Sequence, residues 1–195
     1  MNGRQRTLRA LKFEAPDRAP RDLWALPGVI TNQPDDLDDL RRDFPMDLFK
    51  CEISPGEIRD DGAEASQYVD DWGSTWHRAE SGVVGEVKEP ALADWGKLDD
   101  FEPPWDMLRA RDLSYVDRQG EKSSSFVLSA VTARPFERVQ FLRGSESLYT
   151  DIGYDRPEFA RLLEIVHAYY LQDVSTWCRT DVDGVMLMDD WESRN

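Results

Sequence analysis

The residues 182–191, Val-Asp-Gly-Val-Met-Leu-Met-Asp-Asp-Trp, decide the fold expected for this chain. Val185 to Met188 form a short, wholly apolar run, which two adjacent carboxylates close. Such a run is typical of a parallel strand that is buried on both faces. Ligands of α/β proteins bind at the carboxyl ends of parallel strands, so this stretch predicts a substrate-binding site at Asp189, Asp190 and Trp191.

The rest of the chain alternates helices and strands, as parallel α/β folds do. The expected helices cover residues 3–13, 34–42, 106–119, 135–142, 145–152 and 155–180, and the expected strands 21–26, 46–53, 125–131 and 185–188. Gly120 and Gly144 are expected to end two of the helices. The last strand needs neighbours and a returning helix, yet only Glu192 to Asn195 follow it. We therefore expect the chain to be incomplete.

A second kind of structure is expected between Asp60 and Pro90. Aromatic and β-branched residues recur there between Gly73, Gly82 and Gly85 without a helical period. This pattern predicts a small antiparallel β meander, formed as an excursion at 60–90 from a single domain that spans 1–195.

Composition excludes several classes of partner. The chain has 24 Lys and Arg against 39 Asp and Glu, a net charge of −15, which repels nucleic-acid phosphates and anionic membranes. We expect neither as a partner. The two cysteines, without a secretory leader, favour a cytoplasmic protein without disulfides, and no apolar run is long enough to cross a bilayer.

The acids after the last strand support several chemistries. If the strand continues through them, Asp189 and Asp190 point to opposite sides, so only one faces a ligand. That carboxylate could bind a metal, act as a base or orient a substrate, and the alternative is an ordinary strand end or helix cap. Arg134 follows the third strand and suits a carboxylate-bearing ligand, unless it pairs with Glu137 instead.

No metal site is expected within the chain. His77 and His167 each lack a second histidine or a cysteine at ligand spacing, and Cys51 and Cys178 read as small apolar residues. The sequence also lacks a phosphate-binding glycine loop and a nucleophile elbow.

Motifs along nearly the whole chain resemble a known family. They are Arg4 to Leu11 followed by Pro16-Asp17-Arg18-Ala19-Pro20, Asp71-Trp72-Gly73-Ser74-Thr75-Trp76, Leu142-Arg143-Gly144, Asp183-Gly184-Val185-Met186 and Asp189-Asp190-Trp191. Together they resemble the amino-terminal part of the uroporphyrinogen decarboxylase-like superfamily. The resemblance implies an α/β protein with an incomplete (β/α)8 TIM barrel, here about four parallel strands and the meander insertion.

Within that superfamily the chain resembles the corrinoid-linked methyltransferases better than the true decarboxylases. The decarboxylases carry an arginine-rich loop after the first strand, whereas Trp24 to Gly28 contain no arginine. They also use a tyrosine after the third strand, where this chain has Phe141. The methyltransferase branch implies methyl transfer from a corrinoid (cobalamin) to a zinc-activated thiol.

The resemblance also implies which parts of the chemistry belong to this chain. The family's zinc ligands, a His-x-Cys pair and a later Cys, lie in the second half of the barrel, so this chain alone is expected to bind neither zinc nor corrinoid and to be inactive. Asp189, Asp190, Trp191 and Arg134 would line the barrel mouth, facing a small molecule or a corrinoid protein. Two alternatives remain open. One is decarboxylation of a tetrapyrrole carboxylate (porphyrin metabolism), and the other is a non-catalytic binding or assembly module that self-associates through exposed barrel edges.

Overall fold

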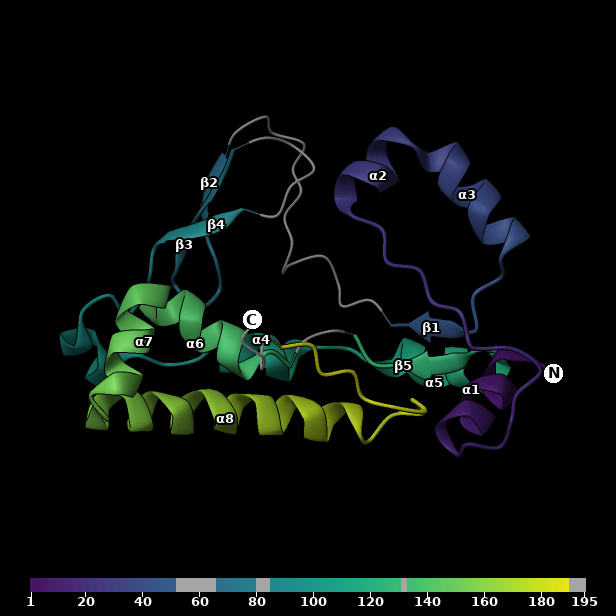
Figure 1. Ribbon diagram of the computed structural model, residues 1–195. Helices are drawn as coiled ribbons and strands as arrows, with labels where there is room; N and C mark the ends of the chain where they lie inside the picture. The colour runs from purple at the N-terminus through teal and green to yellow at the C-terminus, as the bar shows by residue number, and fades with distance from the viewer. Residues whose placement is uncertain (52–65, 80–84, 131–132, 190–195) are drawn as a thin grey trace.

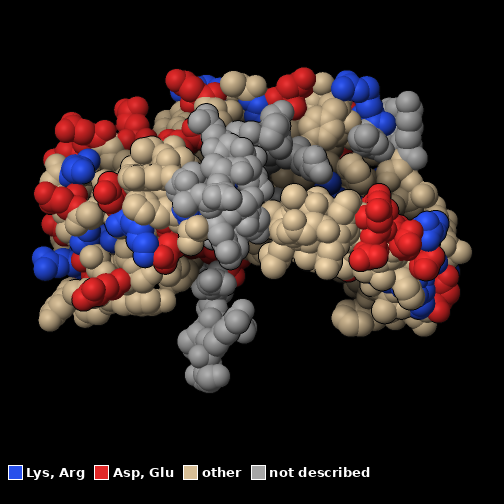
Figure 2. Space-filling model, turned by 90° about the horizontal axis from the view of Figure 1, so that it is seen from above, with Lys and Arg blue, Asp and Glu red and all other residues tan. Residues whose placement is uncertain are grey.

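The computed structural model describes residues 1–51, 66–79, 85–130 and 133–189, which form a mixed α/β protein with two separate sheets. Figure 1 shows the long helix α8 (Pro157–Trp177) along one side of the molecule, beneath α6 (Pro135–Arg143) and α7 (Ser145–Gly153). The antiparallel sheet lies above these helices, and α2 (Pro27–Asn32) and α3 (Pro34–Asp43) stand apart from them. Figure 2 shows acidic side chains gathered toward both ends of one face, with basic ones among them.

The parallel sheet pairs β1 (Leu48–Lys50) with β5 (Phe126–Leu128), with Leu48 opposite Phe126. Residues 184–187 continue the parallel order beside β5 through two isolated bridges, Leu128 to Gly184 and Ala133 to Leu187. The sequence predicted about four parallel strands, whereas the parallel sheet of the described residues contains two strands and this bridged segment. The expected barrel is therefore reduced here to a mixed α/β arrangement with a short parallel sheet.

The strand expected at 21–26 was wrong. The stretch is not assigned as a strand, and among the described residues it has only one backbone–backbone hydrogen bond to a neighbour, from the Asp47 N–H to the Arg21 carbonyl (2.9 Å). Trp24 and Leu26 are 56% and 70% exposed, and no residue of the stretch is fully buried. Pro27, directly after this stretch, occupies the first position of helix α2 (Pro27–Asn32), where its missing N–H costs nothing.

The expectation that residues 185–188 are buried on both faces was also wrong. Leu187 is 63% exposed and Met188 is 36% exposed, while Val185 is partly buried against the sheet. The physical reason is that, within the described residues, the segment has a neighbour only on its β5 side. An apolar strand with one neighbour leaves its other edge and part of its surface in solvent.

The meander is confirmed. Strands β2 (Ser66–Val69), β3 (Thr75–Arg78) and β4 (Glu86–Glu89) form an antiparallel sheet in the order β2-β3-β4. Gly73 has φ +84° in the turn between β2 and β3, a backbone region that favours glycine. The parts of the expected meander at 60–65 and 80–84 lie outside the described residues.

Most of the helices were predicted correctly. Asn2 caps α1 (Gly3–Leu11) with a complete capping box, and two acids open α3 (Pro34–Asp43). Gly144, with φ +77°, ends α6 as expected. A short 3-10 helix, η1 (Trp95–Asp100), lies between the meander and the next α-helix.

The single helix expected at 106–119 is two helices, α4 (Trp105–Ala110) and α5 (Ser114–Lys122). The side chain of Asp112 accepts the N–H of Ser114 (2.9 Å), which starts α5 and also lowers the pKa of Asp112. Gly120 does not end a helix, since it lies inside α5. A Cβ there would stand 2.8 Å from the Asp181 carbonyl oxygen, so the glycine permits a close chain approach.

Helix α8 joins two apolar cores. Its residues Leu162, Val166 and Tyr169 pack with α6, α7 and Trp72 in the larger core, whereas Trp177, fully buried, packs against Val127 of the parallel sheet. An apolar stripe therefore runs along this helix, and the helix packs against the parallel sheet only at its last turn. None of the helices in the described part of the chain is long and apolar enough to cross a membrane.

Candidate functional site

The segment 182–189 is fixed to β5 at its amino end. The Asp183 carboxylate accepts the Val127 N–H (2.8 Å) and the Arg4 Nε–H (2.8 Å), tying the segment to the sheet and to α1. Ser129 then bonds twice, donating its N–H to the Gly184 carbonyl (3.0 Å) and accepting the Met186 N–H on its hydroxyl (2.8 Å). These bonds set the register that places Asp189 beside the start of α6.

Asp189 caps α6 from a distant part of the sequence. Its carboxylate accepts the backbone N–H groups of Phe136 (2.6 Å) and Glu137 (2.8 Å), two of the donors that a helix leaves unpaired in its first turn. A negative charge there is also stabilised by the helix dipole. The sequence left open that this acid is a helix cap, and the structure shows Asp189 in that role.

Arg134 lies at the same end of α6, directly before Pro135. Its Nη1 donates to Glu137 (3.0 Å), the competing partner that the sequence offered, and a third of the Arg134 side chain is exposed. An ion pair at this spacing and exposure stabilises by only about 0.2–0.5 kcal/mol. A carboxylate ligand that bound the guanidinium through two hydrogen bonds would therefore displace Glu137 readily.

The structure thus brings together Arg134 and Asp189, which the sequence predicted at one rim, and adds Glu137 between them. Both residues lie beyond the carboxyl ends of parallel segments, Arg134 after β5 and Asp189 after the bridged segment. Asp190 and Trp191 lie outside the described residues. The substrate-binding role of all four stays a prediction.

Arg138 connects this end of α6 with the meander. It forms an ion pair with Asp70 (3.0 Å) and lies over the ring of Trp72, 4.8 Å from the ring centroid. Asp70 in turn accepts the indole N–H of Trp76 and the N–H groups of the turn after β2. Asp70 therefore stabilises the turn between β2 and β3, and Trp72 and Trp76 are held beside it.

The described residues do not fit a zinc site. No three His, Cys, Asp or Glu side chains among them are grouped to hold a metal ion. His77 and His167 are exposed on β3 and α8, and Cys178 follows α8. Cys51 is buried, which raises the pKa of its thiol to about 11 and disfavours the thiolate that a metal needs.

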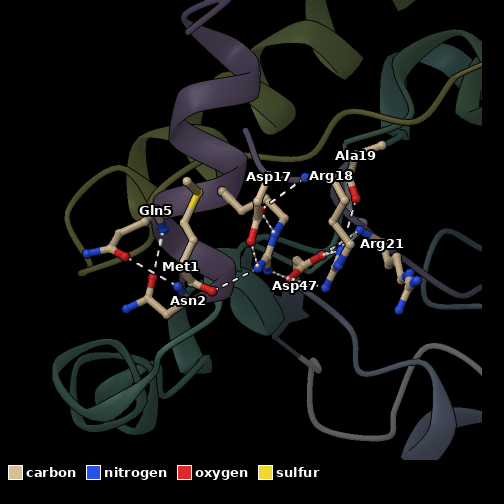
Figure 3. A network of polar contacts seen from close by, with 9 residues as sticks. Met1, Asn2, Gln5, Asp17, Arg18, Ala19, Arg21 and Asp47 are labelled. Atoms are coloured by element: carbon tan, nitrogen blue, oxygen red, sulfur yellow. Dashed lines mark hydrogen bonds and ion pairs between the residues drawn. The ribbon is translucent and has the colours of Figure 1, made fainter. Parts of the chain in front are cut away.

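A second cluster of charges surrounds Asp47, the residue before β1 (Figure 3). Its buried carboxylate accepts hydrogen bonds from the Arg6 and Arg18 guanidinium groups and from the Arg21 N–H (2.8 Å). Arg6 also binds Asp17 in a two-point contact at 2.6 and 2.8 Å. Because each of these charges has partners, the cluster fixes α1 and the following loop to β1 rather than forming an open site.

Sequence reasoning did not find two of these arrangements. Asp47 carried no local signal except its position directly before a predicted strand, and its arginine partners lie 29 and 41 residues away. The spacing could have indicated that Arg138 lies near Arg134, because residues four apart share one face of a helix. Its partner Asp70 belongs to another element and cannot be read from that spacing.

The chain matches no family model, and neither a curated protein nor a solved structure is significantly similar to it.

Proposed function

We propose that this chain provides one wall of the site of a uroporphyrinogen decarboxylase-like, corrinoid-dependent methyltransferase. The observation that carries the proposal is the meeting of Arg134 and Asp189 at the first turn of α6. The family resemblance of the sequence motifs supports the reaction class. The parallel order of 48–50, 126–128 and 184–187 supports a barrel-like arrangement, because sequential parallel strands with helices between them follow the same order in a (β/α)8 barrel.

In this proposal Arg134 binds the carboxylate of a ligand, and Asp189 holds Arg134 in position. The Asp189 carboxylate accepts hydrogen bonds from two N–H groups at the start of α6, so these donors are not available to a ligand. The anion-binding group at this rim is therefore the Arg134 guanidinium. Asp189 is a positioning residue, since it holds α6 and therefore the Arg134 backbone at the end of the parallel segments. The described residues do not fit zinc, so no step of the transfer is assigned to them.

Two observations favour methyl transfer over porphyrinogen decarboxylation. The ring of Phe141 packs edge-on against Trp76, with 4.7 Å between the centroids, so this position offers no hydroxyl group to a substrate. The stretch from Trp24 to Gly28 offers no guanidinium, and Lys50 is its nearby cation, 3.9 Å above the Trp24 ring. A substrate with many carboxylates would meet few cations here.

The test is an assay of the protein expressed from its complete gene, supplied with zinc, methylcobalamin and a carboxylate-bearing thiol. We expect methylation of the thiol and no release of carbon dioxide from uroporphyrinogen. Carbon dioxide release without thiol methylation would replace the proposal by the decarboxylase alternative.

The exposure of Leu187 and Met188 favours a second candidate function, a binding or assembly module. The edge of the segment 184–187 that does not face β5 has no strand partner among the described residues, and an unpaired edge offers backbone donors and acceptors to another chain. In this alternative, a second copy covers that edge and no turnover is expected under any of the assay conditions above.

A further inference from the structure

A hollow of about 410 Å³ lies between α8 and the stretch that joins η1 to α4. Phe101 and Trp105 line it on one side, and Glu164, Ile165 and Ala168 of α8 line it on the other. None of these residues belongs to the α6 site described above. The volume is within the range of about 300–1,000 Å³ that small-molecule sites occupy.

The aromatic side chains of the hollow are fixed from behind. The Trp105 ring packs against Tyr169 with 5.4 Å between centroids, and the Phe101 ring stacks on Trp72 at 6.4 Å. Tyr169 and Trp72 belong to the larger apolar core and are 3% and 5% exposed. The rings that face the hollow are therefore held in place before any ligand binds, which lowers the entropic cost of binding.

Two carboxylates complete the lining. Within the described residues, neither Glu102 nor Glu164 forms a hydrogen bond or an ion pair through its side chain. Two arginines close to them in sequence have other partners, because Arg161 pairs with Asp99 and Arg109 pairs with Asp106 (2.8 Å). The net negative charge of the hollow is thus not neutralised from within the described chain.

We propose that this hollow binds a small organic cation, of the quaternary or alkylated ammonium class. The faces of aromatic rings attract such cations, and burying their alkyl groups away from water is itself favourable. Glu102 and Glu164 supply the opposite charge, and Ile165 adds apolar contact. A hard metal ion fits poorly, because Mg²⁺ and Ca²⁺ need about six oxygen ligands and the lining offers two carboxylates.

Calorimetric titration of the wild-type chain with choline tests the proposal. The control probe is 3,3-dimethylbutan-1-ol, which has the shape of choline but no charge. We expect choline to bind with a millimolar dissociation constant and the neutral probe to bind at least about tenfold more weakly. Absence of choline binding, or equal binding of the two probes, would overturn the proposal.

Substitutions locate the binding. Glu164→Gln should weaken choline binding about threefold or more, whereas Glu14→Gln, which removes the same charge from the exposed loop after α1, should leave it unchanged. Ala168→Arg, on an exposed helical position, should abolish binding while the far-ultraviolet circular dichroism stays that of the wild type. Equal weakening by Glu164→Gln and Glu14→Gln, or undiminished binding by the folded Ala168→Arg protein, would show that the cation binds elsewhere.

Discussion

At the scale of single residues, several carboxylates of this chain accept hydrogen bonds from backbone N–H groups and from arginine side chains. Asp183 anchors the start of the segment 182–189, Asp189 caps α6 at its end, and Asp47 gathers Arg6 and Arg18. Each carboxylate joins elements that are far apart in the sequence. The acids of the chain are therefore structural connections as well as the source of its negative charge.

Replacing Asp189 by alanine should lower the free energy of unfolding by about 1 kcal/mol, because the first-turn N–H groups of α6 lose their acceptor and the favourable charge. Asp189→Asn should cost less, since the amide oxygen still accepts a hydrogen bond. Urea denaturation measures both. Asp100→Ala, at the exposed last residue of η1, is the matched control and should change stability little. Equal losses at 100 and 189 would contradict the capping role.

The charge cluster at Asp47 makes stability depend on acid. The hydrogen bond with Arg6 lowers the pKa of Asp17 to about 2. Burial alone would raise the pKa of Asp47, but hydrogen bonds from Arg18, the Arg21 N–H and Arg6 together lower it. A carboxyl group with a lowered folded-state pKa stabilises the fold above its unfolded pKa of about 4, and this contribution is lost as the pH falls.

The urea midpoint of the wild type should therefore fall between about pH 4 and pH 2, the window set by the unfolded and folded pKa values of Asp17. Asp17→Asn should be less stable than the wild type at neutral pH and should lose less on acidification. An unchanged slope of midpoint against pH in Asp17→Asn would show that Asp17 contributes nothing to acid sensitivity.

At the scale of elements, the joint between α6 and the meander holds the upper part of the molecule to the helices. Arg138 spans it by pairing with Asp70 and covering Trp72, and Phe141 packs on Trp76. The meander is a three-stranded sheet, and such small sheets need packing against a helix or an apolar face to be stable. The contacts of α6 provide that support.

Arg138→Met should keep apolar contact with Trp72 but lose the ion pair and the cation–π contact, at a cost of about 1–3 kcal/mol. Amide hydrogen exchange should accelerate in β2 and β3 more than in α8. Arg109→Met, which breaks an exposed pair on α4, is the control. Uniform acceleration over all elements would argue against a local joint.

The elements were predictable where their signals are local. Asn2, Pro34 and Gly144 set helix ends through their own backbone chemistry, and these ends are where the sequence placed them. The break between α4 and α5 was missed, because it depends on Asp112 capping α5 and on Arg111 reaching Asp173 of α8. Arg134 and Asp189 were predicted at one rim. Whether each binds a ligand or another part of the protein could not be predicted, because these contacts depend on how the segment 182–189 is positioned beside α6 in the folded chain.

At the scale of the whole molecule, the parallel sheet is narrow. Within the described residues, β5 alone has parallel neighbours on both sides, β1 and the segment 184–187. The outer edges of these neighbours and the exposed Leu187 present pairing groups and apolar surface together. This arrangement is the basis for the proposal that the chain self-associates through an edge.

We expect the chain to self-associate at micromolar concentrations, and Leu187→Lys to shift it toward the monomer, because a charge on an edge opposes strand pairing. Sedimentation velocity over a concentration series measures both. Leu171→Lys, at a position of α8 that is 70% exposed, should leave association unchanged. A wild-type monomer at every concentration, with sharp two-state melting, would favour an independent domain.

The central claim is that Arg134, held at the rim by α6, binds the carboxylate of a methyl-transfer substrate. The most direct measurement is the kinetics of thiol methylation by the complete gene product carrying Arg134→Ala, with Arg42→Ala on the exposed face of α3 as control. We predict a fall of about tenfold to a hundredfold in kcat/KM, mostly through KM, for Arg134→Ala alone. Equal kinetics for the wild type and Arg134→Ala would contradict the claim.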